Sequence, residues 1–256
     1  MPRLSGRQRN PLGRTVRLLG WMVDHDAEDF GVRQLAAAVG MAPSTVHRSL
    51  GALEEEGLVE SDLESGRYRL SLGFYRLALK GGRRAPLREV AHPFVLETAR
   101  AAEEACQLAV YGEIQLAVMY LLEIPSLRRL QVRARLHEWQ PLTRSAAGLA
   151  VLSKLDSESV VAAFANGAKG RSGSDLAERL EQVRRQGFAV TVGWTEAGCV
   201  ELAAPFTGAD GRVQGALCLG LPEVRFTPQL ESALGNLLTV EATKLGRALD
   251  APRPES

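Results

Sequence analysis

The sequence predicts an α+β protein in two parts, a small unit of three helices and a β-hairpin and then a larger unit of helices and antiparallel strands. Helical periodicity fills most of residues 12–56, and two short strand-like segments follow it directly. Strands and helices with hairpin signals then alternate up to residue 249. Of the 256 residues, 45% are hydrophobic and 24% are charged, so both parts can bury a core.

Three short helices are expected in the first part, over residues 12–23, 32–39 and 43–56. Each places aliphatic side chains on one face at helical spacing. Gly40 ends the second helix and tolerates a positive φ, and Pro43 suits the first turn of the third. Ala36 is small enough to let these two helices cross closely. The pattern predicts a helix-turn-helix.

A β-hairpin is expected next, with strands over residues 58–60 and 67–72 joined by the turn-forming segment 62–66. A hairpin in this place is the wing of a winged helix-turn-helix. The first domain is therefore expected to cover residues 1–73, and a basic linker helix residues 74–88.

Basic segments flank the helix-turn-helix. Residues 1–17 carry five arginines and no acid, and residues 67–88 carry seven arginines or lysines and no acid. The net charge of only +1 neither demands nor excludes nucleic acid. Local asymmetry of this kind is typical of a DNA-facing edge on a neutral protein, so we expect double-stranded DNA as a partner.

The exposed start of the third helix is predicted to enter the major groove, where hydroxyl, imidazole and guanidinium groups can bond to base edges. Arginines of the second helix and the hairpin are expected to hold phosphates. The predicted DNA-binding residues are Arg33, Pro43, Ser44, Thr45, His47, Arg48, Arg67, Tyr68 and Arg69. Alternatives stay open: Ser44 caps a helix, Arg69 pairs with an acid, or the whole face is merely solvated.

The larger domain is expected over residues 89–250, followed by a disordered tail, 251–256. Its predicted helices cover residues 87–105, 145–155, 157–165, 175–186 and 227–249. Its predicted strands cover residues 106–124 with a bend at Gly112, 130–136, 188–192, 199–206 and 212–219. Because the last two strands form a hairpin across Asp210-Gly211, the class is α+β rather than doubly wound.

Several other classes of protein are not expected. Three widely spaced cysteines and four scattered histidines form no metal-ligand spacing, so we expect no metal and no cofactor. No coherent nucleophile and base are present, and the glycine-rich segment 167–174 has the wrong order for a phosphate loop, so we expect no enzyme. No apolar run approaches the about 20 residues of a membrane span and no signal peptide is recognisable, which predicts a cytoplasmic protein without a membrane partner.

Short motifs along nearly the whole chain carry a resemblance to a known family. They are Leu35-Ala36, Gly40, Pro43 to Arg48, Leu53 to Val59, Gly66 to Leu70, Pro141-Leu142 to Gly148, Arg184 to Phe188, Ala203 to Pro205 and Asp210 to Val213. In this order they resemble the IclR-type transcriptional regulators. The resemblance implies a winged helix-turn-helix joined by a linker helix to a GAF-like effector-binding domain with a curved antiparallel sheet. It also implies a homodimer or a dimer of dimers, a palindromic operator, and a repressor controlled by a small-molecule effector.

The resemblance places the effector pocket between the sheet and the loop and helix after Pro141. The implied pocket residues are Ser145, Ala146, Ala147, Thr191, Cys199, Glu201, Cys218 and Gly220. The chain departs from the family at several of these places. Thr143 stands where a histidine is usual, Leu149 where a lysine is usual, and Val200-Glu201 where an Arg-Cys pair is usual.

Glu201 is the departure with the clearest chemical consequence. Strand alternation puts Cys199, Glu201 and Ala203 on one face, the face that meets the ligand in the family. A buried carboxylate there would repel an anion and favour a cationic, amine or hydroxyl-rich effector. The alternative is that Glu201 turns to solvent or pairs with an arginine, in a degenerate domain that serves only in oligomerisation.

Overall fold

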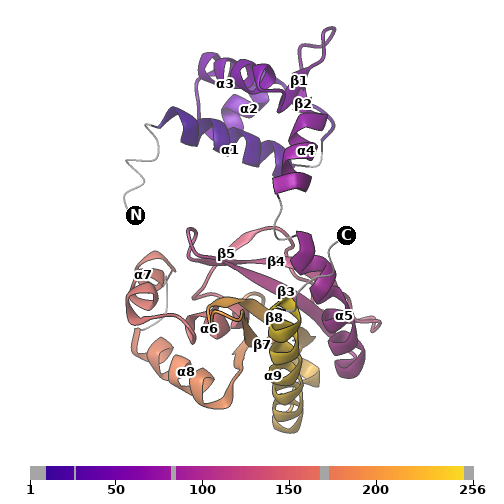
Figure 1. The fold of residues 1–256 in the computed structure, drawn as a ribbon, viewed down its shortest axis with the longest axis vertical. Coiled ribbons are helices and arrows are strands. Elements are labelled where there is room, and N and C mark those ends of the chain that lie inside the picture. Colours follow the sequence, from indigo (N-terminus) through magenta and orange to yellow (C-terminus); the bar gives the residue numbers. More distant parts are fainter. Residues whose placement is uncertain (1–9, 26, 82–84, 168–172, 251–256) are drawn as a thin grey trace. The chain divides into compact units, whose positions relative to one another are not determined.

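A computed structural model describes residues 10–25, 27–81, 85–167 and 173–250. The chain forms two compact units, residues 1–85 and 86–256, each with its own core (Figure 1). The predicted tail, residues 251–256, lies outside the described residues.

The first unit is a winged helix-turn-helix. Its elements are α1 (Pro11–Asp24), α2 (Val32–Val39), α3 (Pro43–Glu55), β1 (Val59–Ser61), β2 (Tyr68–Leu70) and α4 (Leu72–Gly81). The three predicted helices and the hairpin are confirmed, and each observed end lies within two residues of the predicted end. β1 and β2 are antiparallel, with Val59 opposite Leu70, and Phe30 exchanges backbone hydrogen bonds with Tyr68, which adds one residue of pairing to the wing.

A tight turn and a small aliphatic core fix the crossing of α2 and α3. Gly40 adopts φ +66°, and its N–H donates to the Ala36 carbonyl. Leu35, Val46 and Leu50 are completely buried between the helices. Because φ at Gly40 lies in the left-handed region, a residue with a Cβ would be strained there. The opposite face of the first two turns of α3 lies at the surface of the unit.

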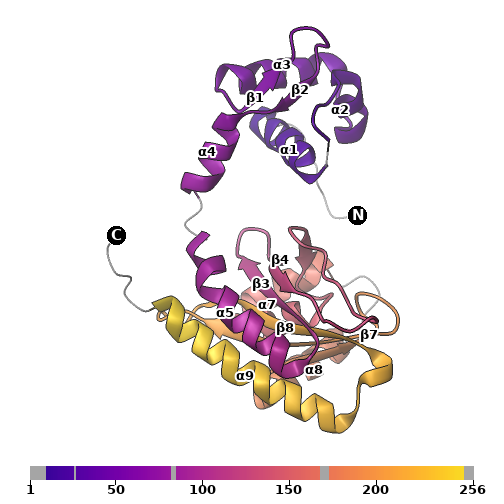
Figure 2. The same ribbon diagram turned by 90° about the vertical axis from the view of Figure 1, so that its right-hand side faces the viewer.

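The second unit is a six-stranded antiparallel sheet with helices on both faces. Its elements are α5 (Ala85–Ala102), β3 (Ala105–Gly112), β4 (Ala117–Ile124), β5 (Trp139–Pro141), α6 (Ala146–Leu152), α7 (Ser157–Gly167), α8 (Gly173–Gln186), β6 (Ala189–Val192), β7 (Cys199–Thr207), β8 (Val213–Pro222), the single 3-10 turn η1 (Glu223–Arg225) and α9 (Pro228–Asp250). The strand order is β5-β4-β3-β8-β7-β6, and the sheet is curled (Figure 2).

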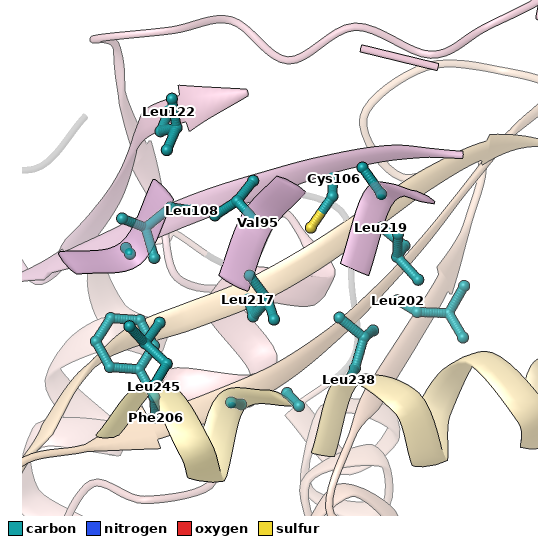
Figure 3. Close-up of a cluster of buried hydrophobic side chains, with 14 of the residues drawn as sticks. Val95, Cys106, Leu108, Leu122, Leu202, Phe206, Leu217, Leu219, Leu238 and Leu245 are labelled. Atoms are coloured by element: carbon teal, nitrogen blue, oxygen red, sulfur yellow. The ribbon is translucent and has the colours of Figure 1, made fainter. Parts of the chain in front are cut away.

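The two faces of this sheet carry different helices because the side chains alternate along each strand. Helices α5 and α9 cover one face, where Leu108, Leu202 and Leu217 pack against Val95 and Leu238 (Figure 3). Helices α6, α7 and α8 cover the other face, which includes Ala109, Ala203 and Cys218. The predicted α+β class is confirmed.

The prediction of a strand over residues 130–136 is wrong. The segment makes a single bridge, between Tyr120 and Leu136, and β5 pairs with β4 as the edge strand in its place. The reason is a side chain from β4. The carboxylate of Glu123 accepts a hydrogen bond from the Ala134 N–H at 2.7 Å and forms an ion pair with Arg133. The Ala134 N–H therefore bonds to a side chain and not to the backbone of a neighbouring strand.

Gly148 allows α6 to lie directly against the loop that precedes it. A Cβ at Gly148 would stand 2.1 Å from the Leu142 carbonyl oxygen. We expect Gly148→Ala to lower the unfolding free energy of the C-terminal unit by about 1–3 kcal/mol, because the backbone must move. Urea denaturation measures the change. Gly20→Ala in α1, where a Cβ meets no atom within 4 Å, is the control, and equal stability of Gly148→Ala and wild type would contradict the packing.

Candidate DNA interface and effector cavity

The start of α3 presents a polar face to solvent. Pro43, Ser44, His47 and Arg48 are exposed, and Thr45 is half-buried. The helix begins after Ala42, which stands at the N-cap without a side-chain hydrogen bond. Ser44 therefore does not cap the helix, and its hydroxyl is available at the surface together with the imidazole and guanidinium groups that follow it.

A basic hollow of about 350 Å³ lies beside this face. It is lined by Arg14 and Arg17 of α1, by the turn 39–42 and by Thr45. Among the described residues, neither arginine forms an ion pair with an acid. The basic run at the start of the sequence indicated positive charge here, but these two residues were not among the predicted site residues.

The wing arginines are each paired with an acid of the same unit. Arg67 Nε lies 2.5 Å from Asp29 Oδ1, and Arg69 Nε lies 2.6 Å from Glu60 Oε1. The hydrogen bond and the charge of Glu60 raise the pKa of Arg69. The alternative in which Arg69 pairs with an acid is therefore the observed one. Both pairs remain 40–60% exposed, so a phosphate can still compete for the arginines.

Tyr68 requires a correction. It was predicted to contact DNA, but its side chain is 7% exposed and belongs to the core of the unit. Alternation along β2 explains this, because Arg67 and Arg69 point outward and the residue between them points inward. Burial raises the pKa of Tyr68, and its ring meets the His47 ring edge-on at 6.5 Å between centroids. Tyr68 thus packs in the core of the unit, on the buried side of α3.

A hydrogen-bonded contact that the sequence did not predict ties α3 to the wing. Glu54 Oε1 accepts the Ser61 N–H at 2.9 Å and the Ser61 hydroxyl at 2.6 Å. These hydrogen bonds lower the pKa of Glu54. The position of the wing relative to α3 is therefore fixed within the unit.

The second unit contains a cavity of about 240 Å³ between the segment after β4, the loop before α6 and the start of β7. Its walls are formed by Tyr120, Val132, Arg133, Ala134, Arg135, Glu138, Trp139, Gln140, Pro141, Arg144, Trp194, Thr195, Glu196 and Glu201. A much smaller hollow of about 10 Å³ shares Tyr120 and Glu201 with it. The segment wrongly predicted as a strand thus supplies one wall of the cavity.

Four of the eight predicted pocket residues line these spaces. Glu201 lines both, and Ala147, Cys218 and Gly220 line the small hollow. The other four lie behind or beside the walls: Ser145 is buried and caps α6, Ala146 and Thr191 donate to Glu201, and Cys199 is half-buried on β7. The pattern gave no signal for the arginines and tryptophans of the cavity.

Glu201 is held by three donors. Its Oε1 accepts the Thr195 hydroxyl at 3.0 Å, and its Oε2 accepts the Ala146 N–H and the Thr191 hydroxyl, both at 3.4 Å. Burial raises the pKa of Glu201, and the three hydrogen bonds oppose that rise. In the described part of the chain, no arginine is its ion-pair partner.

Arg133, which lines both spaces, has a different partner. Arg133 Nε lies 2.6 Å from Glu123 Oε2, and the Glu123 side chain is only 2% exposed. Glu123 also accepts from Gln107 at 3.2 Å. The charge of Arg133 is therefore balanced by Glu123.

The three cysteines are free. The register of β7 and β8 places Ala203 opposite Cys218 and Pro222 opposite Cys199. Burial raises the pKa of all three thiols. Within the described residues, no group of three or more His, Cys, Asp or Glu side chains could hold a metal ion, and no helix is both long and apolar enough to cross a membrane.

Known proteins match both units. Residues 11–63 match the IclR helix-turn-helix domain, and residues 82–254 match the bacterial transcriptional regulator IclR C-terminal domain. The chain is 26% identical over 227 residues to the HTH-type transcriptional regulator KdgR of Escherichia coli, a match that covers 86% of each protein. It is 28% identical over 231 residues to the glycerol operon regulatory protein of Streptomyces coelicolor, covering 84% of this chain and 89% of that protein.

Solved structures share the fold. An IclR transcriptional regulator from Silicibacter sp. superposes with a TM-score of 0.77 at 25% identity, covering 96% of this chain and 98% of that one. An IclR homologue from Microbacterium hydrocarbonoxydans, crystallised with 4-hydroxybenzoate, superposes with a TM-score of 0.76 at 23% identity, covering 94% and 99%.

Thiol labelling tests the geometry of the sheet. In the native protein we expect a disulfide reagent to label Cys199 faster than the other two, because Cys106 and Cys218 are buried and Cys199 is partly exposed. Cys199→Ser should abolish the faster phase, and Cys218→Ser should leave it unchanged. A faster phase that persists in Cys199→Ser would show that Cys106 or Cys218 is accessible, against the packing described here.

Proposed function

This chain belongs to the IclR family of bacterial transcriptional regulators, and we propose that it is a repressor that binds operator DNA through the exposed start of α3. The observation that carries the proposal is the polar face formed by Ser44, His47 and Arg48, which the core of the N-terminal unit holds at the surface. A DNA-binding regulator of this kind works in the cytoplasm, beside the chromosome.

The chemistry of this face suits base edges in the major groove. Ser44 and Thr45 offer hydroxyls, His47 offers an imidazole, and Arg48 can donate two hydrogen bonds to a guanine. Phosphates on either side would bind arginines of the surrounding elements. The proposed phosphate contacts are Arg14, Arg17, Arg33, Arg67 and Arg69.

The cavity of the C-terminal unit is proposed as the effector site. Its volume of about 240 Å³ and its mixture of polar groups and aromatic rings support a sensing role over a purely oligomeric one. The relative that holds 4-hydroxybenzoate supports the same assignment.

A homodimer is proposed as the DNA-binding form. Large hydrophobic side chains are exposed on two helices of the first unit, Leu12, Val16 and Val23 on α1 and Leu72, Tyr75 and Leu77 on α4. A second copy would cover such surfaces. Effector binding would then change the spacing of the two recognition helices and their fit to the half-sites.

Removing Arg48 should weaken sequence-specific binding. We expect Arg48→Ala to lower the affinity for the DNA upstream of the gene by about 5- to 150-fold, since a bidentate base contact contributes about 1–3 kcal/mol. Mobility shifts over a salt series measure this. Arg212→Ala, which removes an exposed arginine of the β7–β8 turn, is the control, and equal affinities of the two variants would refute the role of α3.

Releasing a wing arginine should strengthen binding. Asp29→Asn removes the acid that competes with phosphate for Arg67, so we expect the affinity to rise about two- to tenfold at low salt and the salt dependence to steepen. Fluorescence anisotropy with labelled duplex measures both. Weaker binding would mean that Asp29 positions the arginine rather than competing for it.

A further inference from the structure

The effector cavity holds an acidic group without a cation beside it. Among the described residues, no lysine, arginine or histidine lies within 4.0 Å of the Glu201 carboxylate. The candidate on the same wall, Arg133, is bound to Glu123. Glu201 is partly buried, and a carboxylate partly removed from water without a counter-charge is destabilised, so a cation from outside the chain would be favourable there.

The hydrogen bonds around Glu201 favour its ionised form as a ligand acceptor. The Ala146 N–H can only donate, and the hydroxyls of Thr191 and Thr195 lie within hydrogen-bond distance. A carboxylate offers about four acceptor positions, so three are filled and about one remains. Because Glu201 lines the cavity, the remaining position is open to an occupant.

The size of the cavity limits what can reach Glu201. The small hollow behind it, bordered by Ala147 and Gly220, measures about 10 Å³, which is about the space of one water molecule. The head group of an occupant therefore ends at Glu201. A primary ammonium group fits this limit and donates hydrogen bonds, whereas a bulky quaternary ammonium would do neither.

The rest of the cavity indicates the body of the occupant. Tyr120, Trp139 and Trp194 line it, and Arg179 lies over the Trp194 ring, 5.3 Å from its centroid. Arg135 and Arg144 share the wall with Glu138 and Glu196, so this part carries no excess of either charge. Flat apolar groups pack well against such rings.

We propose that the effector is a small primary amine whose ammonium group donates to Glu201 and whose flat apolar body lies against Trp139 and Trp194. This inference rests on the proposed effector-controlled DNA binding. It selects the amine among the cationic, amine and hydroxyl-rich effectors that the sequence left open. A carboxylate is disfavoured as the group beside Glu201, because the two charges would repel each other.

A matched panel of compounds tests the proposal on the full chain. Propyl, hexyl, benzyl, phenethyl and indolylethyl skeletons are each supplied as the primary amine, the alcohol and the carboxylic acid, and calorimetric titration measures their dissociation constants. For the aromatic skeletons we expect the amine to bind about 10- to 100-fold more tightly than the acid or the alcohol, because hydrogen bonds to a charged group are the stronger ones.

Two variants locate the interaction. Glu201→Gln keeps the size and an acceptor oxygen but removes the charge, so we expect the preference for the amine to fall to less than about threefold. Glu158→Gln removes an exposed carboxylate of α7 that does not line the cavity and should keep the preference. Thermal unfolding of each variant, compared with wild type, verifies the fold.

Each outcome decides the proposal. Preferential binding of the aromatic amines that is lost in Glu201→Gln supports it. Tighter binding of acids or alcohols, binding of no amine at millimolar concentration, or a preference that survives in Glu201→Gln overturns it. A mobility shift on the upstream DNA is run beside the panel. If the wild-type chain binds DNA but shows no preference for amines, the effector class alone is refuted, whereas absence of DNA binding refutes the proposed function.

Discussion

The packing of α2 against α3 is the constraint on which the function of this protein depends. Leu35 and Val46 exclude water from the crossing, and Gly40 lets the chain reverse between the helices at φ +66°. Polar groups on a short isolated helix would have no fixed geometry, because such helices are marginal in water. Burial of one face of α3 therefore gives Ser44 to Arg48 a defined arrangement, and Tyr68 and Glu54 hold the wing against the same helix.

In the C-terminal unit, two contacts keep a cavity open beside the packed sheet. Gly148 brings α6 close to the Leu142 carbonyl, and Glu123 holds the segment around Ala134 away from regular strand pairing. Glu201 then accepts three hydrogen bonds, and among the described residues no cationic side chain lies within 4.0 Å of its carboxylate. Glu201 thus gives this wall of the cavity a carboxylate without an adjacent counter-charge.

Local patterns predicted the fold well and the site only in part. Periodicity and the Gly40 turn were sufficient for α1 to α3. The inward position of Tyr68 could have been predicted from its flanking arginines, since strand neighbours point to opposite faces. The failure at residues 130–136 arose from a long-range contact, because Glu123 takes the Ala134 amide. Cavity walls are assembled from segments far apart in sequence, so Trp139 and Arg144 left no local signal.

Site-specific photocrosslinking tests the central claim most directly, that the start of α3 meets the bases. A photoreactive amino acid replaces Thr45 in the full chain, and a second variant carries it at Arg212. Both are irradiated with duplexes that the wild-type protein selects from genomic fragments. We expect a covalent DNA adduct from position 45, mapped to the centre of a half-site, and none from position 212. An adduct from position 212 with none from position 45 would contradict this claim.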